Sequence, residues 1–225
     1  MMEPIAHIEN DYDDKFGIPR QSGLVTELSS IIVFEPTYRI PEALREIETF
    51  DYIWLIWQFN QNLRDEWSPT VRPPRLGGNQ RVGVFASRSP FRPNGLGLSS
   101  VRLLGVERKE DRGDVLWVAG ADLMNGTPIF DIKPYIPYTD SHPEARAGFA
   151  PERPKQKLHV NCPPTLLSVL PDDERRHNLL QILSLDPRPP YQDDLEKMYG
   201  FVFAKHEIRF RVVGETLQVM GVEKA

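Results

Sequence analysis

The sequence predicts a mainly β protein, with a closed barrel or sandwich in residues 1–137 and a small α+β domain in residues 155–225. Short runs of β-branched and aromatic residues recur through the first part, separated by Gly, Pro, Asn and Asp. Only one early segment has a helical pattern, which favours a barrel or sandwich over alternating strands and helices. After Pro137 a polar connection runs to about residue 154, and a helical pattern then precedes further strands.

The strands of the first part follow from the spacing of apolar runs and turn residues. We expect them at Ile5–Glu9, Ser30–Glu35, Asp51–Phe59, Arg81–Ala86, Leu98–Val106, Val115–Ala121 and Ile129–Tyr135. Asp51–Phe59 is rich in the aromatic and β-branched residues that half-buried sheets prefer. In Val115–Ala121 the residues that point to one face and those that point to the other are both apolar, which predicts that both faces of that strand are covered. The early helix is expected at Pro41–Glu48, since proline suits a first helical position and apolar residues recur on one side.

The second part is expected to begin with helix and end with strand. Tyr138–Pro154 is polar and proline-rich, so it is expected to be an exposed connection. His159–Leu185 is expected to be helical between its prolines, because Asp172–Glu174 place negative charge where a helix N-terminus favours it. Phe201–Val213 and Leu217–Val222 are expected to be strands, the former half-exposed because apolar and charged residues alternate in it.

The composition argues against several classes of protein. The lone Cys162 excludes an intrachain disulfide and a cysteine-rich zinc site, and it predicts a reducing, cytoplasmic location. The five histidines have no ligand-like spacing, so no metal is expected. No apolar run approaches the length of a membrane span, and the first ten residues do not resemble a signal peptide.

A local reversal of charge is the strongest indication of function. The chain carries a net charge of −5, yet the stretch from Pro69 to Gly105 contains six arginines and no acidic residue. The arginines are Arg72, Arg75, Arg81, Arg88, Arg92 and Arg102. Any one of them could be a solvated loop residue, but together, among prolines and glycines, they predict a surface that binds anions such as nucleic acid phosphates.

Several unbroken runs of sequence occur in order along the chain: Pro19-Arg20-Gln21, Val71 to Asn79, Gly83 to Arg88, Phe91 to Asn94, Asn125 to Pro128, Asp131 to Tyr135 and Asp186 to Tyr191. With these runs the chain resembles the TsaA-like family, whose bacterial members methylate tRNA. The resemblance covers nearly the full chain. It implies a β-barrel that binds S-adenosylmethionine at or near a homodimer interface, followed by a smaller C-terminal domain. It also implies methylation of N6 of threonylcarbamoyladenosine, the nucleoside 3′ of the anticodon.

The resemblance also implies roles for individual residues. The cofactor contacts carried over are Arg20, Gln21, Ser22, Asn60, Gln61, Arg88, Leu98, Gly120, Ala121, Asp122 and Leu123. Asn60 departs from the histidine that is common in the family, and Asn125 from a common aspartate. An imidazole at position 60 is therefore not required here, and an acid role at position 125 is in doubt.

Physical chemistry sorts the charged residues further. A guanidinium close to the sulfonium would disfavour cofactor binding, so Arg20 or Arg88 is expected at the cofactor carboxylate. The residues expected to bind tRNA or the threonyl group are Arg72, Arg75, Arg92, Asn94 and Lys133. Asp122 either accepts hydrogen bonds from the cofactor or caps a turn.

The acceptor nitrogen is a weak nucleophile, so the enzyme must align it and assist loss of its proton. The candidates for positioning or proton removal are Asp131, Lys133, Tyr135 and Tyr191, of which Asp131 and Tyr191 are taken as the catalytic residues. Simple orientation with water as the proton acceptor stays an alternative. Two other functions also stay open: a non-catalytic tRNA-binding protein that retains the cofactor pocket, and a methyltransferase of this fold with another small substrate.

Overall fold

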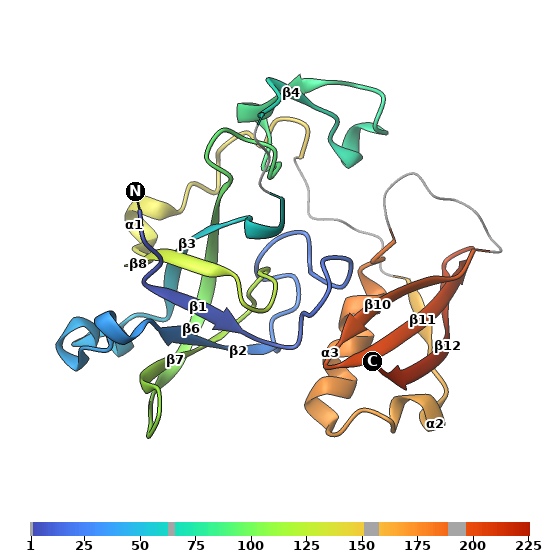
Figure 1. The fold of residues 1–225 in the computed structure, drawn as a ribbon. Coiled ribbons are helices and arrows are strands. Elements are labelled where there is room, and N and C mark those ends of the chain that lie inside the picture. The colour runs from blue at the N-terminus through green and yellow to red at the C-terminus, as the bar shows by residue number, and fades with distance from the viewer. Residues whose placement is uncertain (1, 63–65, 151–157, 189–196) are drawn as a thin grey trace.

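The computed structural model describes residues 2–62, 66–150, 158–188 and 197–225, and it contains two main sheets (Figure 1). The strands of the first sheet are β1 (Ala6–Glu9), β2 (Ser29–Phe34), β3 (Tyr52–Gln58), β6 (Leu96–Lys109), β7 (Gly113–Ala119) and β8 (Pro128–Pro134). They pair in the order β1-β2-β7-β6-β3-β8, and β8 returns to β1, so the sheet closes on itself. The prediction of a mainly β protein is confirmed.

Alternation along the strands places the first core inside this closed sheet. In β3, Ile53, Leu55 and Trp57 are buried, while the residues between them are exposed or half-buried. β7 buries residues on both faces, as its two apolar sets predict.

Two predicted elements of the first part differ from the structure. Arg81–Ala86 contains only the two-residue strand β5 (Val82–Gly83), paired with β4 (Thr70–Val71), and then turns into a 3-10 helix at Val84–Ala86. Pro41–Glu48 is not one helix but 3-10 turns at Pro41–Leu44 and Ile47–Thr49. Glu46 lies between these turns with φ = 67°, and a right-handed helix cannot continue through a residue with positive φ.

The second sheet has the order β10-β11-β12-β9 and carries a helix on one side (Figure 1). Its elements are β9 (His159–Asn161), α2 (Pro164–Leu167), α3 (Asp173–Ser184), β10 (Tyr199–Phe203), β11 (His206–Val213) and β12 (Thr216–Lys224). His159–Asn161 is therefore strand, not helix, because it pairs in parallel with β12. The predicted strand Phe201–Val213 is a hairpin, turned at Ala204 and Lys205 with φ of 50° and 60°.

The segment between β1 and β2 belongs to the second core, although it lies at the start of the chain. Tyr12, Val25 and Leu28 are buried in the cluster formed by α3 and the second sheet. The Asp11 carboxylate pairs with Arg175 of α3 at 3.0 Å, and the Ala204 N–H donates to the Asp11 carbonyl. The two sheets are thus joined by an early loop as well as by the connection after β8.

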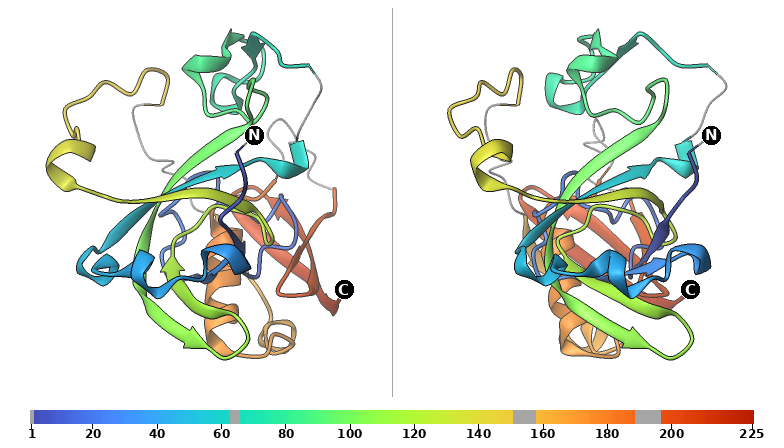
Figure 2. Two further views of the ribbon diagram at one scale, coloured as in Figure 1. Left: turned by 60° about the vertical axis from the view of Figure 1, so that its left-hand side comes forward. Right: turned by 90° about the vertical axis from the view of Figure 1, so that its left-hand side faces the viewer.

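Loops that carry most of the arginine-rich stretch lie at one end of the closed sheet. Figure 2 shows β4, β5 and the neighbouring 3-10 helices there, with the turn between β6 and β7 at the opposite end. The start of the predicted connection is α1 (Pro137–Asp140), anchored by a 2.8 Å hydrogen bond from Trp54 Nε1 to Asp140 Oδ2. Among the residues that the structure describes, no helix is both long enough and apolar enough to cross a membrane.

Candidate functional site

Asp122 presents an enclosed carboxyl group on the turn after β7. Ser99 Oγ donates to Asp122 Oδ1 at 2.5 Å, and the backbone N–H of Ser22 also donates to this carboxylate. Burial raises the pKa of Asp122, while these hydrogen bonds and the positive charge of Arg88 oppose the rise. An acid held in this way can accept further hydrogen bonds from a ligand.

Glycines shape the turn that holds Asp122. Gly120 adopts φ = 80°, a left-handed conformation that favours glycine, and its carbonyl accepts from the Gly23 N–H at 2.9 Å. A Cβ at Gly120 would lie in ordinary van der Waals contact with the Gly23 backbone, at 3.5 Å, so it is the positive φ that favours glycine here. The turn of Gly120, Ala121, Asp122 and Leu123 is thereby fixed against the loop that contains Gln21 and Ser22, with Ala121 and Leu123 buried in the first core.

Gln21 and Arg88 meet although they are 67 residues apart in the sequence. Arg88 Nη1 donates to Gln21 Oε1, and the charge of Arg88 is close enough to lower the pKa of Asp122. Three predicted cofactor residues, from three separate segments, therefore lie together. Both Arg88 and Gln21 retain exposed surface for a ligand.

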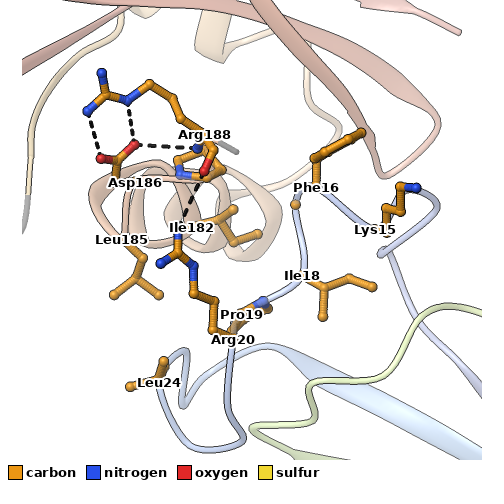
Figure 3. Close-up of a pocket in the computed structure, with 12 residues that line it drawn as sticks. Lys15, Phe16, Ile18, Pro19, Arg20, Leu24, Ile182, Leu185, Asp186 and Arg188 are labelled. Carbon is orange, nitrogen blue, oxygen red and sulfur yellow. Dashed lines mark hydrogen bonds and ion pairs between the residues drawn. The ribbon is translucent and has the colours of Figure 1, made fainter. Parts of the chain in front are cut away.

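Arg20 points away from this cluster, toward the C-terminal domain. Its Nη2 donates to the Arg188 carbonyl at 3.4 Å, and Arg188 forms a bidentate ion pair with Asp186 through two contacts of 2.8 Å (Figure 3). These residues line a cavity of about 220 Å³ between the early loop and the end of α3, with Ile18 and Leu185 on its apolar side. Both arginines considered for the cofactor carboxylate contact Gln21, but Arg20 does so only through its carbonyl, which accepts from Gln21 Nε2 at 2.5 Å. Among the contacts described, only Arg88 directs its guanidinium to another predicted cofactor residue.

Asn60, Gln61 and Leu98 lie at the ends of β3 and β6. Asn60 and Gln61 form an exposed 3-10 helix directly after β3. Leu98 is 57% exposed and pairs across the sheet with Ile56, while its neighbour Ser99 is buried inside. Because neighbouring strand residues face opposite sides, Leu98 points away from the side on which Ser99 meets Asp122.

The predicted catalytic residue Asp131 lies on β8 beside the predicted tRNA contact Lys133. Lys133 Nζ is 3.0 Å from Asp131 Oδ2, and the Ile132 N–H donates to Asp131 Oδ1. Asp131 pairs with Ile56, which pairs in turn with Leu98, so these three residues form a row across β8, β3 and β6. Tyr191, the other predicted catalytic residue, lies outside the described residues.

Arg102 is separated along the chain from the loops that carry the other arginines of this stretch. It lies in the middle of β6, paired with Tyr52 of β3 and Ala119 of β7. Arg92 Nη1 donates to the carbonyls of Ser87 and Ser89, so this guanidinium also braces its own loop. Arg72 and Asn94 are exposed, whereas the side chain of Arg75 lies outside what the structure describes.

Sequence reasoning missed Ser99 and Trp57, which lie directly behind Asp122. Trp57 Nε1 donates to Ser99 Oγ at 3.0 Å. No motif contains either residue, and only the register of β3 against β6 brings them together. Among the described residues, no group of histidine, cysteine and acidic side chains is arranged to hold a metal.

Comparison with known proteins places the whole chain in one family. Residues 7–141 match the model of the tRNA-methyltransferase O N-terminal domain, and residues 155–225 match that of the TrmO C-terminal domain. The chain is 37% identical over 228 residues to the tRNA (adenine(37)-N6)-methyltransferase of Escherichia coli K12, covering 98% of this chain and 97% of that protein.

Two further relatives come from Pseudomonas aeruginosa. One is a putative S-adenosylmethionine-dependent methyltransferase, RcsF, 38% identical over 85% of this chain and 83% of its own length. The other is the crystal structure of TrmO, with a TM-score of 0.79 at 30% identity, which covers 100% of this chain and 97% of that one.

Proposed function

The chain belongs to the tRNA-methyltransferase O family, and we propose from this premise that it methylates N6 of threonylcarbamoyladenosine next to the anticodon of tRNA. It is an S-adenosylmethionine-dependent tRNA (adenine-N6)-methyltransferase. The threonylcarbamoyl group is our more specific assignment. The observation that carries the proposal is the meeting of Gln21, Arg88 and Asp122 from three distant segments.

The chemistry of these groups fits S-adenosylmethionine. Arg88 and the Gln21 amide suit the carboxylate of the cofactor, and the Asp122 carboxylate suits hydroxyl or amine donors of its nucleoside. The other cofactor contacts we propose are Arg20, Ser22, Asn60, Gln61, Leu98, Gly120, Ala121 and Leu123. When bound, the cofactor supplies an electrophilic methyl group on a cationic sulfur.

Asp131 is our candidate for handling the proton of the acceptor nitrogen. N6 of the modified adenine is delocalised into the purine and the carbamoyl carbonyl, so alignment and proton removal are both required. Lys133 Nζ lies 3.0 Å from Asp131 Oδ2, and Asp131 retains exposed surface. We propose that Asp131 orients or deprotonates N6 and that Tyr191 assists it.

The loops at the β4 end form the proposed tRNA surface. Arg72 and Asn94 are exposed there, and we assign them, with Arg75, Arg92 and Lys133, to tRNA phosphates or the threonyl carboxylate. This assignment rests on local charge, because this stretch is basic within a chain of net charge −5.

We also propose the assembly of the protein. Residues 1–137, with a connection to about 154, would be the cofactor-binding β-barrel domain, and residues 155–225 the C-terminal domain. A homodimer is supported by Leu98, a proposed cofactor contact that is 57% exposed and faces outward from the first sheet. A partner copy over that face would place Leu98 in a shared site. Because the substrate is tRNA, we propose a cytoplasmic location.

A methyl-transfer assay tests the substrate assignment. Purified protein is incubated with S-adenosylmethionine and the same tRNA prepared with and without the threonylcarbamoyl group, and the digested nucleosides are measured by mass spectrometry. The methylated nucleoside is expected only from the modified tRNA. Equal transfer to both tRNAs would reject the substrate assignment, and tRNA binding without transfer to either would favour the non-catalytic alternative.

A further inference from the structure

The side chains of Trp57, Ser99 and Asp122 form a hydrogen-bond chain with a fixed direction. The Trp57 indole N–H can only donate, and its acceptor is Ser99 Oγ at 3.0 Å. The single hydroxyl proton of Ser99 then lies toward Asp122 Oδ1, at 2.5 Å. If Asp122 carried a proton on that oxygen, the hydroxyl proton of Ser99 would lose its acceptor inside a buried site. The chain therefore holds Oδ1 as an acceptor.

The donor at the start of this chain cannot swing away. Gly97 lies directly opposite Trp57 in the β3–β6 register, and a Cβ at Gly97 would lie 2.3 Å from the indole ring. The indole also packs against Phe59, with ring centroids 4.3 Å apart. Trp57 is 6% exposed and Ser99 1% exposed, so both are fixed by packing.

We propose that Ser99 is a positioning residue, which holds the Asp122 carboxylate ready to accept hydrogen bonds from the ribose hydroxyls of the methyl donor. This inference rests on the proposed function, since it names the ligand of the same site. Ser99 itself, at 1% exposure, acts through Asp122 and not by touching the ligand. The other groups around the Asp122 carboxylate are its own backbone N–H, the Ser22 N–H, the Arg88 guanidinium and the buried phenol of Tyr12.

Calorimetry with S-adenosylmethionine gives the first test. Ser99→Ala is expected to weaken the affinity about 10- to 100-fold, the range expected for loss of a hydrogen bond to a charged group. Ser100→Ala is the matched control, because Ser100 is the next residue on β6 and faces the opposite side of the sheet. Its affinity is expected to equal that of the wild type.

The pH profile separates positioning from general damage. The Ser99 hydrogen bond lowers the pKa of Asp122, so its removal raises that pKa. In Ser99→Ala the loss of affinity on acidification is therefore expected to begin at a higher pH than in the wild type. A variant that is only destabilised would keep the wild-type profile.

Nuclear magnetic resonance of the ligand-free protein gives a readout without cofactor. Among the four tryptophans, the Trp57 indole resonance is identified by its loss in Trp57→Phe. In the wild type and in Ser100→Ala its chemical shift is expected to follow the titration of Asp122 through the Ser99 hydroxyl. In Ser99→Ala this pH-dependent shift is expected to disappear, while the other indole resonances show that the fold is retained.

The outcomes distinguish the two proposals. A wild-type protein that does not bind S-adenosylmethionine overturns the proposed function. The indole titration still decides whether Trp57, Ser99 and Asp122 are connected by hydrogen bonds. A wild type that binds, with unchanged affinity, pH profile and indole titration in Ser99→Ala, overturns the role of Ser99 alone.

Discussion

A single guanidinium, that of Arg88, connects two residues proposed to hold the cofactor. It donates to Gln21, and its charge favours the ionised form of the enclosed Asp122. Arg88 itself is exposed, so it contributes little to packing. Its contribution is expected to appear in binding and not in folding.

Replacing Arg88 by alanine tests this assignment. Arg88→Ala is expected to weaken S-adenosylmethionine binding about 10- to 100-fold by calorimetry, because a charge-assisted contact to the cofactor carboxylate is lost. The free energy of unfolding is expected to change by no more than about 0.5 kcal/mol, as for other surface positions. The control is Arg102→Ala, an exposed arginine on β6 outside the site. Equal affinity of Arg88→Ala and the wild type would show that Arg88 is not a cofactor contact.

At individual residues, the sequence could indicate which residues lie close together, but not the direction of each side chain. The resemblance implies that Gln21, Arg88 and Asp122 share a cofactor site, and in the structure these residues lie together. Arg20, from the same motif as Gln21, turns toward Arg188 instead. Such differences depend on the direction of each side chain in a folded loop, which spacing along the chain does not encode.

The packing of β3 on β6 depends on the absence of a side chain at Gly97. Gly97→Ala would force the Trp57 ring to move, because the new Cβ would lie 2.3 Å from it. We expect a loss of about 1–3 kcal/mol in the free energy of unfolding, measured by urea denaturation. We also expect weaker cofactor binding, since Trp57 holds Ser99.

Gly83→Ala is the matched control for this prediction. Gly83 lies in β5 with φ = −59°, and nothing lies within 4 Å of a Cβ built there. Gly83→Ala is expected to change the free energy of unfolding by no more than about 0.5 kcal/mol. Equal stability of the two variants would contradict the proposed contact between Trp57 and β6.

The N-terminus of α3 provides a prediction about pH. Asp172 accepts a 2.8 Å hydrogen bond from the Arg175 N–H, which is the largest cause of its lowered pKa. A lowered folded-state pKa means that this stability is present above the unfolded pKa of about 3.9 and is lost as the pH falls through the folded value. Asp172→Ala is therefore expected to lower the free energy of unfolding by about 1 kcal/mol at pH 7 and by progressively less below about pH 4.

Denaturant unfolding at several pH values measures this effect. Asp173→Ala, at the first helical position, is the control, because the Asp173 side chain is 96% exposed and makes no cap. At pH 7, Asp173→Ala is expected to lower the free energy of unfolding by less than Asp172→Ala does. A loss for Asp172→Ala that stays constant down to pH 2 would mean that the ionised cap contributes nothing.

Alternation predicted most strands of the first sheet, but it could not locate the turns of the second. Glu207–Val213 alternates as predicted, and Ile208, Phe210 and Val212 are buried. The sequence also predicted strand across Ala204 and Lys205, but these two residues form the hairpin turn. The turn contains no glycine or proline that would have marked it in the sequence. Pro41–Glu48 has the composition of a helix, yet the chain breaks at Glu46. Tertiary contacts decide such boundaries.

At the scale of the whole molecule, the loop between β1 and β2 connects the two sheets. Tyr12 pairs with Phe203 through a backbone bridge, and a Cβ at Gly17 would lie 2.6 Å from the Phe201 ring. The sequence predicted two parts, but it could not show that residues from the start of the chain complete the second core. That packing joins positions about 190 residues apart and leaves no local signal.

The charge distribution leads to a prediction about tRNA. Arg72→Ala combined with Arg75→Ala is expected to lower tRNA affinity and to reduce the slope of log K against log salt by about 1.4–1.8, since fewer counterions are released. Arg108→Ala with Lys109→Ala is the control, because these cations lie beside the β6–β7 turn at the other end of the sheet (Figure 2). Binding titrations at several salt concentrations measure the slope. An unchanged slope in the first pair would assign those arginines a structural role.

The central claim is that this protein methylates an adenine that already carries a threonylcarbamoyl group. Mass spectrometry of tRNA nucleosides from cells with and without the gene tests it most directly. We predict that the N6-methylated form of threonylcarbamoyladenosine disappears in cells without the gene, while the unmethylated form accumulates, and that Arg88→Ala restores methylation only partly. Unchanged levels of the methylated nucleoside after removal of the gene would contradict the claim.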